Sequence, residues 1–593
     1  MRLPSVAKWQ QAHHHHQNSR SWRTLLFVPI ILLVGAFVHS CWQAGINRTV
    51  RWPAVWQRRH ATMHHLRPKQ GLLLVNSVVD ARHPIVDLIQ MGERVWQDKL
   101  QSQSKTLREA YDEYVRRYKR RPPRGFDKWW EWCRSSGVQL LDEYDQINRD
   151  LEFFWSVKPS ELIAAQAELE THDFTHTIGK TREGGNITIL AEHGAESRAQ
   201  RQLELIDPIK EHLPPFRATW YAHDAAWFFT SWEIKEAGRK AVAAGTYVDI
   251  SKTKVDPPRW SSACPPDSAL HSFNWTNRLH DPDAYTKRSP KAFIADFFNS
   301  MDPCHNPDLI HLTTLNGLRE GPDMIRTPFP LFARSKVHPY SDILGVPAED
   351  PIDESPDSVS WHQKNDARLM WRGTTTGQVF NDGSPGWNMS HRLRFVQLAN
   401  KKAGSVPVIP PPNKLDDPMH RPEEWQVSEL NEFYFDVGLT GTLQCDPAQC
   451  DEIHAKYTFK DGIHAEVGRK YKYILDMDGN GWSSRFRRMM SRNSIVLKST
   501  VYPEWWTDRS MPWVHYVPVN PDYGDIYDVM AFFRGLPNGT RGHDDLAKKI
   551  ATAGRKWVDQ FWREKDMTAY TWRLYLEYAR VMSEDRSSMD FIM

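Results

Sequence analysis

The chain lacks a strong charge of either sign. Its 593 residues include 76 lysines and arginines against 73 aspartates and glutamates, so the formal net charge at pH 7 is only +3. No long block of one sign interrupts this balance. Proteins that bind nucleic acid carry basic faces or tails, so we expect no nucleic-acid partner.

Cysteine is also scarce, with 6 copies in the chain. Cys445 and Cys450 are close enough in sequence to close a small loop, and Cys264 and Cys304 both stand beside proline in turn-like sequence. Our hypothesis is that these are two disulfides and that Cys133, in a helical segment, is a free buried thiol. Sequence alone does not settle the pairing. Disulfides are typical of the secretory pathway.

One long apolar run lies near the N-terminus, at residues 22–46. It contains no charge between Arg23 and Arg48 and is long enough to span a bilayer, with Trp22 and Trp42 placed like interface anchors. A cleaved signal peptide is the alternative, but no small-residue cleavage site follows promptly. We therefore expect an uncleaved signal anchor that ties the protein to a membrane.

The basic residues on the two sides of this run do not fix its orientation, but the glycosylation acceptors favour one. All of them follow the run, and they are Asn47, Asn186, Asn274, Asn388 and Asn538. We expect a single-pass type II protein with a lumenal body. The final tetrapeptide is no ER-retrieval signal, which makes the Golgi the expected compartment.

The most informative stretch is Tyr471–Lys498, which reads as a strand, a glycine-bearing turn, an arginine-rich helix and a second strand. Gly479 and Gly481 permit a tight turn, and Ser483 or its neighbour can cap the helix that carries Arg485. Unpaired backbone N–H groups, a helix N-terminus and an arginine would then point at one spot. A phosphate or diphosphate suits such a place.

Two metal sites compete for the same residues. Residues 476–481 resemble the start of an EF-hand loop, but its twelfth position is Arg487 rather than glutamate, which argues against calcium. Asp476 and Asp478 could also grip a nucleotide-sugar diphosphate through a divalent ion, but the arginines already supply positive charge. We expect no metal and no cofactor, and for Asp476 a turn-forming role.

The residues around this stretch resemble a known family. The run LDMDGNGWSSRFRRMMSRNSIVLKSTVYPEWW, followed by PWVHYVPV, is similar to the signature of glycosyltransferase family 90, which holds the capsule-associated CAP10-like proteins and the protein O-glucosyltransferases. The similarity extends to WRGTTTG at 371–377, RRPPRGFDKWWEW at 120–132 and YDQINRDLEFFW at 144–155. It covers most of the chain from about 105 to 580, and fungal-type members are the most similar.

This resemblance implies an α/β fold of the GT-B type, with two Rossmann-like domains facing one another across a cleft. The expected segments are a cytoplasmic tail (1–21), the membrane anchor (22–46), a stem with the first helix of the body (47–104), a helical arm (105–183), an acceptor-side domain (184–365) and a nucleotide-sugar-binding domain with closing helices (366–582).

The resemblance also carries site residues over by motif. The expected contacts to the nucleotide sugar are Arg372, Gly373, Thr374, Thr375, Ser483, Arg485 and Glu504. Arg485 would stabilise the departing diphosphate, and Glu504 would hold ribose hydroxyls. The alternative for Arg372 and Arg485 is local stacking and pairing only.

The general base is harder to identify. In the animal O-glucosyltransferases a catalytic aspartate follows the strand that resembles residues 308–314, but this chain has no carboxylate there. Asp224, beside His223, is the first candidate. Glu320 is the second, with Asp323 close by. For Asp224 a purely structural hydrogen bond is the alternative.

Together these observations predict an inverting glycosyltransferase that moves xylose or glucose from a UDP-sugar to a hydroxyl of a glycan or glycoconjugate. The opposing hypothesis is a membrane-tethered, non-catalytic glycan-binding protein that keeps the nucleotide site and has lost its base.

Overall fold

The computed structural model describes residues 63–76, 80–253, 259–274, 283–315, 325–348, 359–382 and 387–593. Residues 62–593 form one compact unit. No helix within the described ranges combines the length and the apolar composition that a membrane span needs. The expected tail (1–21), the expected anchor (22–46) and the first part of the stem lie outside the described residues.

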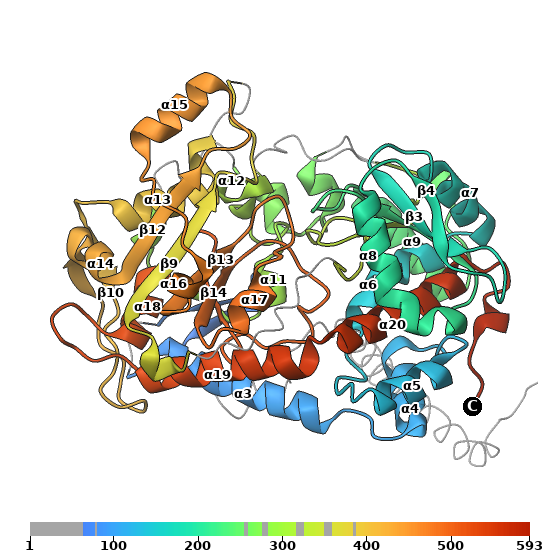
Figure 1. Ribbon diagram of the computed structural model, residues 1–593, viewed down its shortest axis with the longest axis horizontal. Helices are drawn as coiled ribbons and strands as arrows, with labels where there is room; N and C mark the ends of the chain where they lie inside the picture. Colours follow the sequence, from blue (N-terminus) through green and yellow to red (C-terminus); the bar gives the residue numbers. More distant parts are fainter. Residues whose placement is uncertain are drawn as a thin grey trace, which may run out of the picture. The chain divides into compact units, whose positions relative to one another are not determined.

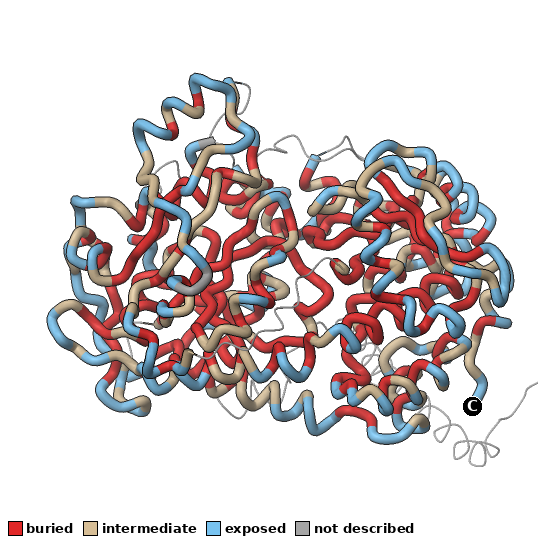
Figure 2. The backbone as a smooth tube through the Cα atoms, in the orientation of Figure 1, coloured by how far each residue is buried: buried red, intermediate tan, exposed pale blue. Residues whose placement is uncertain are grey.

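The C-terminal half is built on a five-stranded sheet with the order β12-β9-β13-β14-β15, in which every neighbouring pair is parallel. Its strands are β9 (Asp366–Thr374), β12 (Phe435–Gly441), β13 (Tyr471–Met477), β14 (Ile495–Ser499) and β15 (Val517–Pro518). β13 and β14 are buried along their whole length apart from one position (Figure 2). Helices cover both faces of such sheets, which explains these continuous apolar runs.

The N-terminal half has a second five-stranded sheet, of order β4-β3-β5-β7-β8. Its strands are β3 (Thr175–Lys180), β4 (Thr188–Glu192), β5 (Phe216–Tyr221), β7 (Leu331–Ala333) and β8 (Ile343–Leu344). β3 pairs antiparallel with both β4 and β5, whereas β5, β7 and β8 run parallel. The α/β class is thus confirmed, with a mixed sheet in this half.

Smaller sheets and helices complete the body. The remaining strands are β1 (His65–Arg67), β2 (Leu72–Leu74), β6 (Ala292–Ile294), β10 (Ser405–Val408) and β11 (Glu423–Gln426). The longer helices are α3 (Pro84–Gln101), α4 (Leu107–Tyr118), α5 (Phe126–Ser135), α6 (Asp145–Trp155), α7 (Pro159–Leu169), α8 (Glu196–Ile206), α9 (Trp232–Ala244), α13 (His391–Asn400), α14 (Val427–Tyr434), α15 (Pro447–Lys456), α18 (Ile526–Arg534), α19 (Asp544–Phe561) and α20 (Glu564–Met582). The short ones are α10 (Asp283–Thr286), α11 (Phe297–Ser300), α12 (Leu309–Leu312), α16 (Ala465–Gly468) and α17 (Phe486–Met490).

The last two helices tie the halves together. α19 packs on α17, α18 and β14 of the C-terminal half, and α20 then packs on α5, α6, α7, α8 and β5 of the N-terminal half (Figure 1). The helical arm joins this core through its tryptophans, since Trp129 is fully buried and its indole N–H donates to the Ala569 carbonyl of α20 at 3.0 Å. The last helix of the chain therefore returns to the N-terminal half.

Two segments differ from expectation. Residues 308–314 were predicted as a strand but form the one-turn helix α12, because the amides of Ile310 and Leu312 bond back to the carbonyls of Pro307 and Asp308. β3 lies in the segment expected to be helical arm, although it is the central antiparallel strand of its sheet. Its sequence THTIGK is too polar to read as a buried strand, yet all six positions are buried.

The cysteine hypothesis is confirmed. Cys264 pairs with Cys304 and Cys445 with Cys450, each with Cα atoms 5.5 Å apart, and Cys133 is free and buried in α5. The acceptor asparagines within the described ranges are all exposed, namely Asn186, Asn274, Asn388 and Asn538.

Candidate functional site

The candidate site begins where two neighbouring parallel strands end. β9 and β13 pair in register at Met370 and Ile474, so their carboxyl ends open on the same edge of the sheet. The turn after β9 reaches the turn after β13 at Gly377, which has a φ of 105°. A Cβ at Gly377 would lie 2.7 Å from the Gly479 carbonyl oxygen. Such an edge is where α/β proteins bind ligands.

Asp476, the sixth residue of β13, organises the turn from below. Its Oδ1 accepts from the Ser483 hydroxyl at 2.8 Å and from Arg485 at 3.2 Å, and its Oδ2 accepts from Lys498 on β14 at 2.7 Å. Burial raises the pKa of this carboxyl, but Lys498 and Arg485 outweigh burial and hold it below its usual value. Asp476 is therefore a charged anchor, as the turn-forming interpretation predicts.

Ser483 does not cap the arginine helix. Its hydroxyl is committed to Asp476, and the N-cap position of α17 is Arg485 itself, with no side-chain cap. α17 has only 5 residues, so its dipole contributes little beyond its first amides. The positive charge at this place comes mainly from side chains.

Arg485 is held in place by hydrogen bonds from only one of its guanidinium nitrogens. Its Nη2 donates to Asp476 and, at 2.9 Å, to the Met477 carbonyl, while its side chain remains 37% exposed. Within the described part of the chain, no hydrogen bond of its Nε or Nη1 occurs. These donors are available for a ligand.

A second arginine, Arg392 at the start of α13, joins Arg485 at this edge. Arg392 donates to the carbonyls of Asp478 at 2.7 Å and Thr374 at 2.8 Å and to the Thr376 hydroxyl at 2.5 Å. Burial and the nearby charge of Arg485 lower the pKa of Arg392 to about 10. Two guanidinium groups that repel one another in this way favour a bound anion.

Two further carboxyl groups lie under the turn. Burial raises the pKa of Glu504 to about 7, with Lys498 at 3.9 Å opposing it, and burial raises the pKa of Asp478 to about 6. Asp478 accepts the Val501 amide at 2.8 Å. Burial therefore disfavours the ionised form of both carboxyl groups, and the nearby charge of Lys498 opposes this effect.

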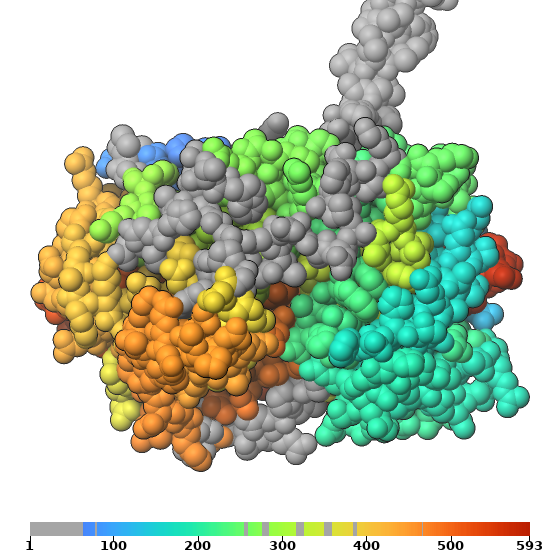
Figure 3. Space-filling view, turned by 90° about the horizontal axis from the view of Figure 1, so that it is seen from above, coloured from blue at the N-terminus to red at the C-terminus, as the bar shows by residue number. Residues whose placement is uncertain are grey.

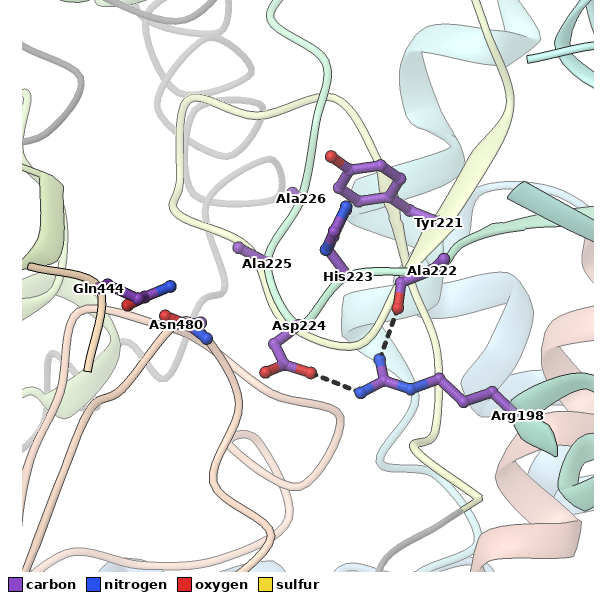
Figure 4. A pocket seen from close by; sticks show the side chains of 9 residues that line it. All are labelled: Arg198, Tyr221, Ala222, His223, Asp224, Ala225, Ala226, Gln444 and Asn480. Atoms are coloured by element: carbon purple, nitrogen blue, oxygen red, sulfur yellow. Dashed lines mark hydrogen bonds and ion pairs between the residues drawn. The ribbon is translucent and has the colours of Figure 1, made fainter. Parts of the chain in front are cut away.

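A pocket of about 450 Å³ adjoins this edge (Figure 4). Its walls come from both halves of the unit, whose surfaces meet along one face of the molecule (Figure 3). The lining residues are Arg198, Tyr221, Ala222, His223, Asp224, Ala225 and Ala226 from the N-terminal half and Gln444 and Asn480 from the C-terminal half.

Asp224 lines the pocket from the N-terminal half. Its Oδ1 accepts from Arg198 at 2.8 Å and from the Trp482 indole N–H at 3.3 Å. No hydrogen bond to its Oδ2 occurs within the described residues. The turn packs directly on the Asp224 backbone, since a Cβ at Gly481 would lie 2.4 Å from the Asp224 carbonyl oxygen. One carboxylate oxygen is thus fixed and the other is left for a ligand.

The predicted residues at the end of β9 and directly after it mostly have partners within the protein. Arg372 donates to the Asp436 carboxylate and carbonyl, each at 2.8 Å, and its side chain is 12% exposed. The Thr375 hydroxyl bonds to the Leu443 backbone, and Gly373 packs on the Trp371 ring. At the edge, the Thr374 carbonyl accepts a hydrogen bond from Arg392. A phosphate contact for Arg372 would require it to leave Asp436.

Glu320 and Asp323 lie outside the described residues. No group of His, Cys, Asp and Glu that could hold a metal ion occurs in the ranges the structure covers.

Comparison with known proteins shows a family that the C-terminal part of the chain resembles. The model of Glycosyl transferase family 90 matches residues 433–589. Protein O-glucosyltransferase 1 of Rattus norvegicus is 30% identical over 122 residues, which is 20% of this chain and 29% of the relative. The O-glucosyltransferase rumi homolog of Aedes aegypti is 30% identical over 234 residues, 39% of this chain and 45% of the relative.

Part of the chain is thus similar to glycosyl transferase family 90. A further relative, the O-glucosyltransferase rumi of Drosophila pseudoobscura pseudoobscura, is 32% identical over 117 residues, 19% of this chain and 27% of the relative. The matches span less than half the length of these curated relatives. The segment matched by the family model includes Ser483, Arg485 and Glu504, but Arg372 and Asp224 precede it.

Sequence reasoning missed several residues of this site. It did not single out Arg392, Arg198, Gln444 or Asn480. Arg392 lies 93 positions before Arg485, and only the parallel pairing of β9 with β13 brings the two together. A search for arginines that follow each glycine-bearing strand end would have found Arg392, whereas no local signal marks Arg198 or Gln444.

Proposed function

We propose that this protein is an inverting glycosyltransferase of the GT-B type that transfers xylose or glucose from a UDP-sugar to a hydroxyl of a glycan or glycoconjugate. The observation that carries the proposal is the pair Arg392 and Arg485 at the carboxyl edge of the β9–β13 sheet, directly beside a pocket that holds a carboxylate. The curated relatives named above are O-glucosyltransferases, which favours the same reaction class.

In the proposed reaction the diphosphate of the UDP-sugar lies against Arg485 and Arg392. An acceptor hydroxyl attacks the anomeric carbon, the new glycosidic C–O bond forms, and the bond from that carbon to the phosphate oxygen breaks with its electrons leaving on UDP. The two arginines stabilise the negative charge that develops on the leaving group. A single displacement of this kind inverts the configuration.

Asp224 is the base that this arrangement favours. Its Oδ2 is open to the pocket and can take the acceptor proton, while Arg198 and Trp482 hold Oδ1 in place. The protonated form would pass its proton to water after UDP and the glycosylated acceptor have left. Glu320 remains the second candidate from the sequence, and we expect no metal to be required.

We also propose that the body lies in the lumen of the secretory pathway, in the Golgi as a type II membrane protein. Support comes from the two disulfides and from the exposure of the acceptor asparagines within the described ranges.

The test is UDP release by the purified full chain with UDP-xylose or UDP-glucose, with and without a panel of glycan acceptors. We expect sustained UDP release only when donor and acceptor are both present, and loss of that release in Asp224→Asn. UDP binding without turnover for any donor would instead support the non-catalytic glycan-binding alternative. Full activity of Asp224→Asn would remove Asp224 as the base.

A further inference from the structure

The anchor of Arg485 carries a charge of the opposite sign. The Asp476 carboxylate accepts from Arg485 at 3.2 Å, and the Asp476 side chain is fully buried. Opposite charges this close, shielded from water, offset much of one another's field at a nearby ligand. If Asp476 and Arg485 were alone, a diphosphate would meet little net attraction. A second cation beside Asp476 restores that attraction.

Lys498 of β14 is such a cation. Its ammonium group donates to Asp476 Oδ2 at 2.7 Å, while Arg485 occupies Oδ1, so one carboxylate is shared between two cations. The side chains of Lys498 and Asp476 are both fully buried, and solvent therefore screens the pair little. Asp476 and Lys498 are also partners in the register of the parallel strands β13 and β14. The sheet itself thus fixes this pairing.

Two other carboxyl groups near Lys498 have weaker claims on its charge. Glu504 lies 3.9 Å from the ammonium group. Burial raises the pKa of Glu504 to about 7 and that of Asp478 to about 6. Burial also lowers the pKa of Lys498, but three carboxyl charges outweigh it, and Asp476 has the largest effect of the three. Asp476 is therefore the main counter-charge of Lys498.

Lys498 has a second contact with the element that carries Arg485. Its ammonium nitrogen lies 4.9 Å from the ring centroid of Phe486, the first residue of α17, and Phe486 is fully buried. A cation over an aromatic face is attracted to it. Lys498 thus contacts both the anchor of Arg485 and the residue that follows Arg485, although it is itself shielded from any ligand.

We propose that Lys498 is a positioning residue of the donor site. It balances the charge of Asp476, so that Asp476 can hold Arg485 in place while the charge of Arg485 remains available to the diphosphate. The inference rests on the proposed function, because it explains how the donor edge of that reaction keeps its attraction for an anion. Lys498 acts through Asp476 and does not contact the donor.

The test is calorimetry of UDP-glucose and UDP-xylose binding to the full chain. Lys498→Met should weaken binding of the tighter donor about 10-fold or more, because Asp476 then offsets the charge of Arg485. The double variant with Asp476→Asn removes both charges and keeps a side-chain oxygen that accepts from Arg485. We expect it to bind the donor within about threefold of the wild type. A role in folding alone predicts no such recovery.

Lys291→Met is the matched control, since Lys291 is another buried lysine and pairs with the buried Asp528 carboxylate at 2.7 Å. This variant should melt at a lower temperature and keep its donor affinity. Unchanged affinity in Lys498→Met, or equal losses in the single and double variants, would overturn the inference.

If Lys498→Met does not fold, the double variant decides. Affinity close to that of the wild type supports the inference, and a loss of about 10-fold or more overturns it. The proposed function is tested separately in the same experiment, because a wild-type chain that binds neither UDP-sugar would contradict it. Donor binding that ignores the charge at Lys498 would remove only the positioning role.

Discussion

At the scale of single residues, the two arginines that the family motifs single out have different environments. Arg372 is 12% exposed and shares Asp436 with Lys460 and Tyr471, whose hydrogen bonds overcome burial and hold the pKa of Asp436 well below its usual value. Arg485 is 37% exposed and keeps donors available. A motif identifies both positions, but it does not show which guanidinium is already paired with a carboxylate of the protein itself.

This difference gives a matched pair of variants. Arg485→Ala should lower kcat/KM for the UDP-sugar by an amount equivalent to about 2 to 4 kcal/mol and leave the melting temperature nearly unchanged. Arg372→Ala should instead mainly lower stability. We expect a loss of about 1 to 3 kcal/mol in the free energy of unfolding, because the variant removes a partner of a shielded carboxylate. Steady-state kinetics and thermal melting of both variants check this. Equal kinetic losses in the two would show that Arg372 also contacts the donor.

Glu504 gives a pH dependence of stability. Its ordinary pKa of 4.5 applies to the unfolded chain, and burial raises the pKa in the folded protein to about 7. Between these values the folded protein binds more protons than the unfolded chain, so the free energy of unfolding should decrease as pH rises from about 4.5 to 7. Above that range both states are ionised and this contribution no longer changes.

The measurement is urea unfolding of the wild type and Glu504→Gln at several pH values. As pH rises through this window, the free energy of unfolding of the wild type should fall relative to that of Glu504→Gln, since glutamine cannot ionise. A constant difference between pH 5 and pH 8 would mean that Glu504 titrates normally in the folded protein.

At the scale of elements, the sequence predicts the regular pieces well. β5 is rich in β-forming residues, and α9 has Ser231 as its N-cap and Gly245 as its C-cap. β13 and β14 flank the arginine turn as predicted. These elements follow from local apolar patterning and capping. β3 and α12 were missed, because a polar strand in the middle of a sheet and a single helical turn carry no such local pattern.

The turn after β13 can be tested as an element. A methyl group at Gly481 would meet the backbone of Asp224 and, at 2.8 Å, the Ala225 amide, so Gly481→Ala should push the turn away from the pocket wall. We expect UDP release to fall at least tenfold, because backbone cannot move aside as a flexible side chain does. Gly462→Ala is the matched control, since nothing lies within 4 Å of its added Cβ. Comparable activity of the two variants would contradict this role for the contact.

At the scale of the whole molecule, residues 62–593 behave as one unit because α20 from the end of the chain is buried in the N-terminal half. Its residues Arg573, Glu577 and Arg580 are buried, Glu577 pairs with both arginines, and Tyr114 of the arm donates to Glu577 at 3.1 Å. The arm, the N-terminal sheet and the C-terminal helix are thereby joined in one core. This continuity fixes the positions of the two walls of the pocket.

A lumenal body should carry glycans. Peptide mass spectrometry of the chain from eukaryotic secretory cells is expected to find N-glycans at Asn186, Asn274, Asn388 and Asn538, which are exposed. Glycosidase treatment should lower the apparent mass, and the corresponding Asn→Gln variants should remove the shift site by site. Unmodified asparagines at all four positions would contradict the proposed lumenal location.

The sequence by itself determined the strand–turn–helix–strand unit around Arg485, the arm and closing helices and the resemblance to a family, because each is encoded in contiguous residues or short motifs. Tertiary structure alone decided which charges meet. It paired Arg372 with Asp436, brought Arg392 to Arg485, and set Asp224 opposite Asn480 and Gln444. Contacts between residues so far apart in sequence arise from strand order and from the packing of the two halves. Neither the strand order nor this packing can be read from a local pattern of residues.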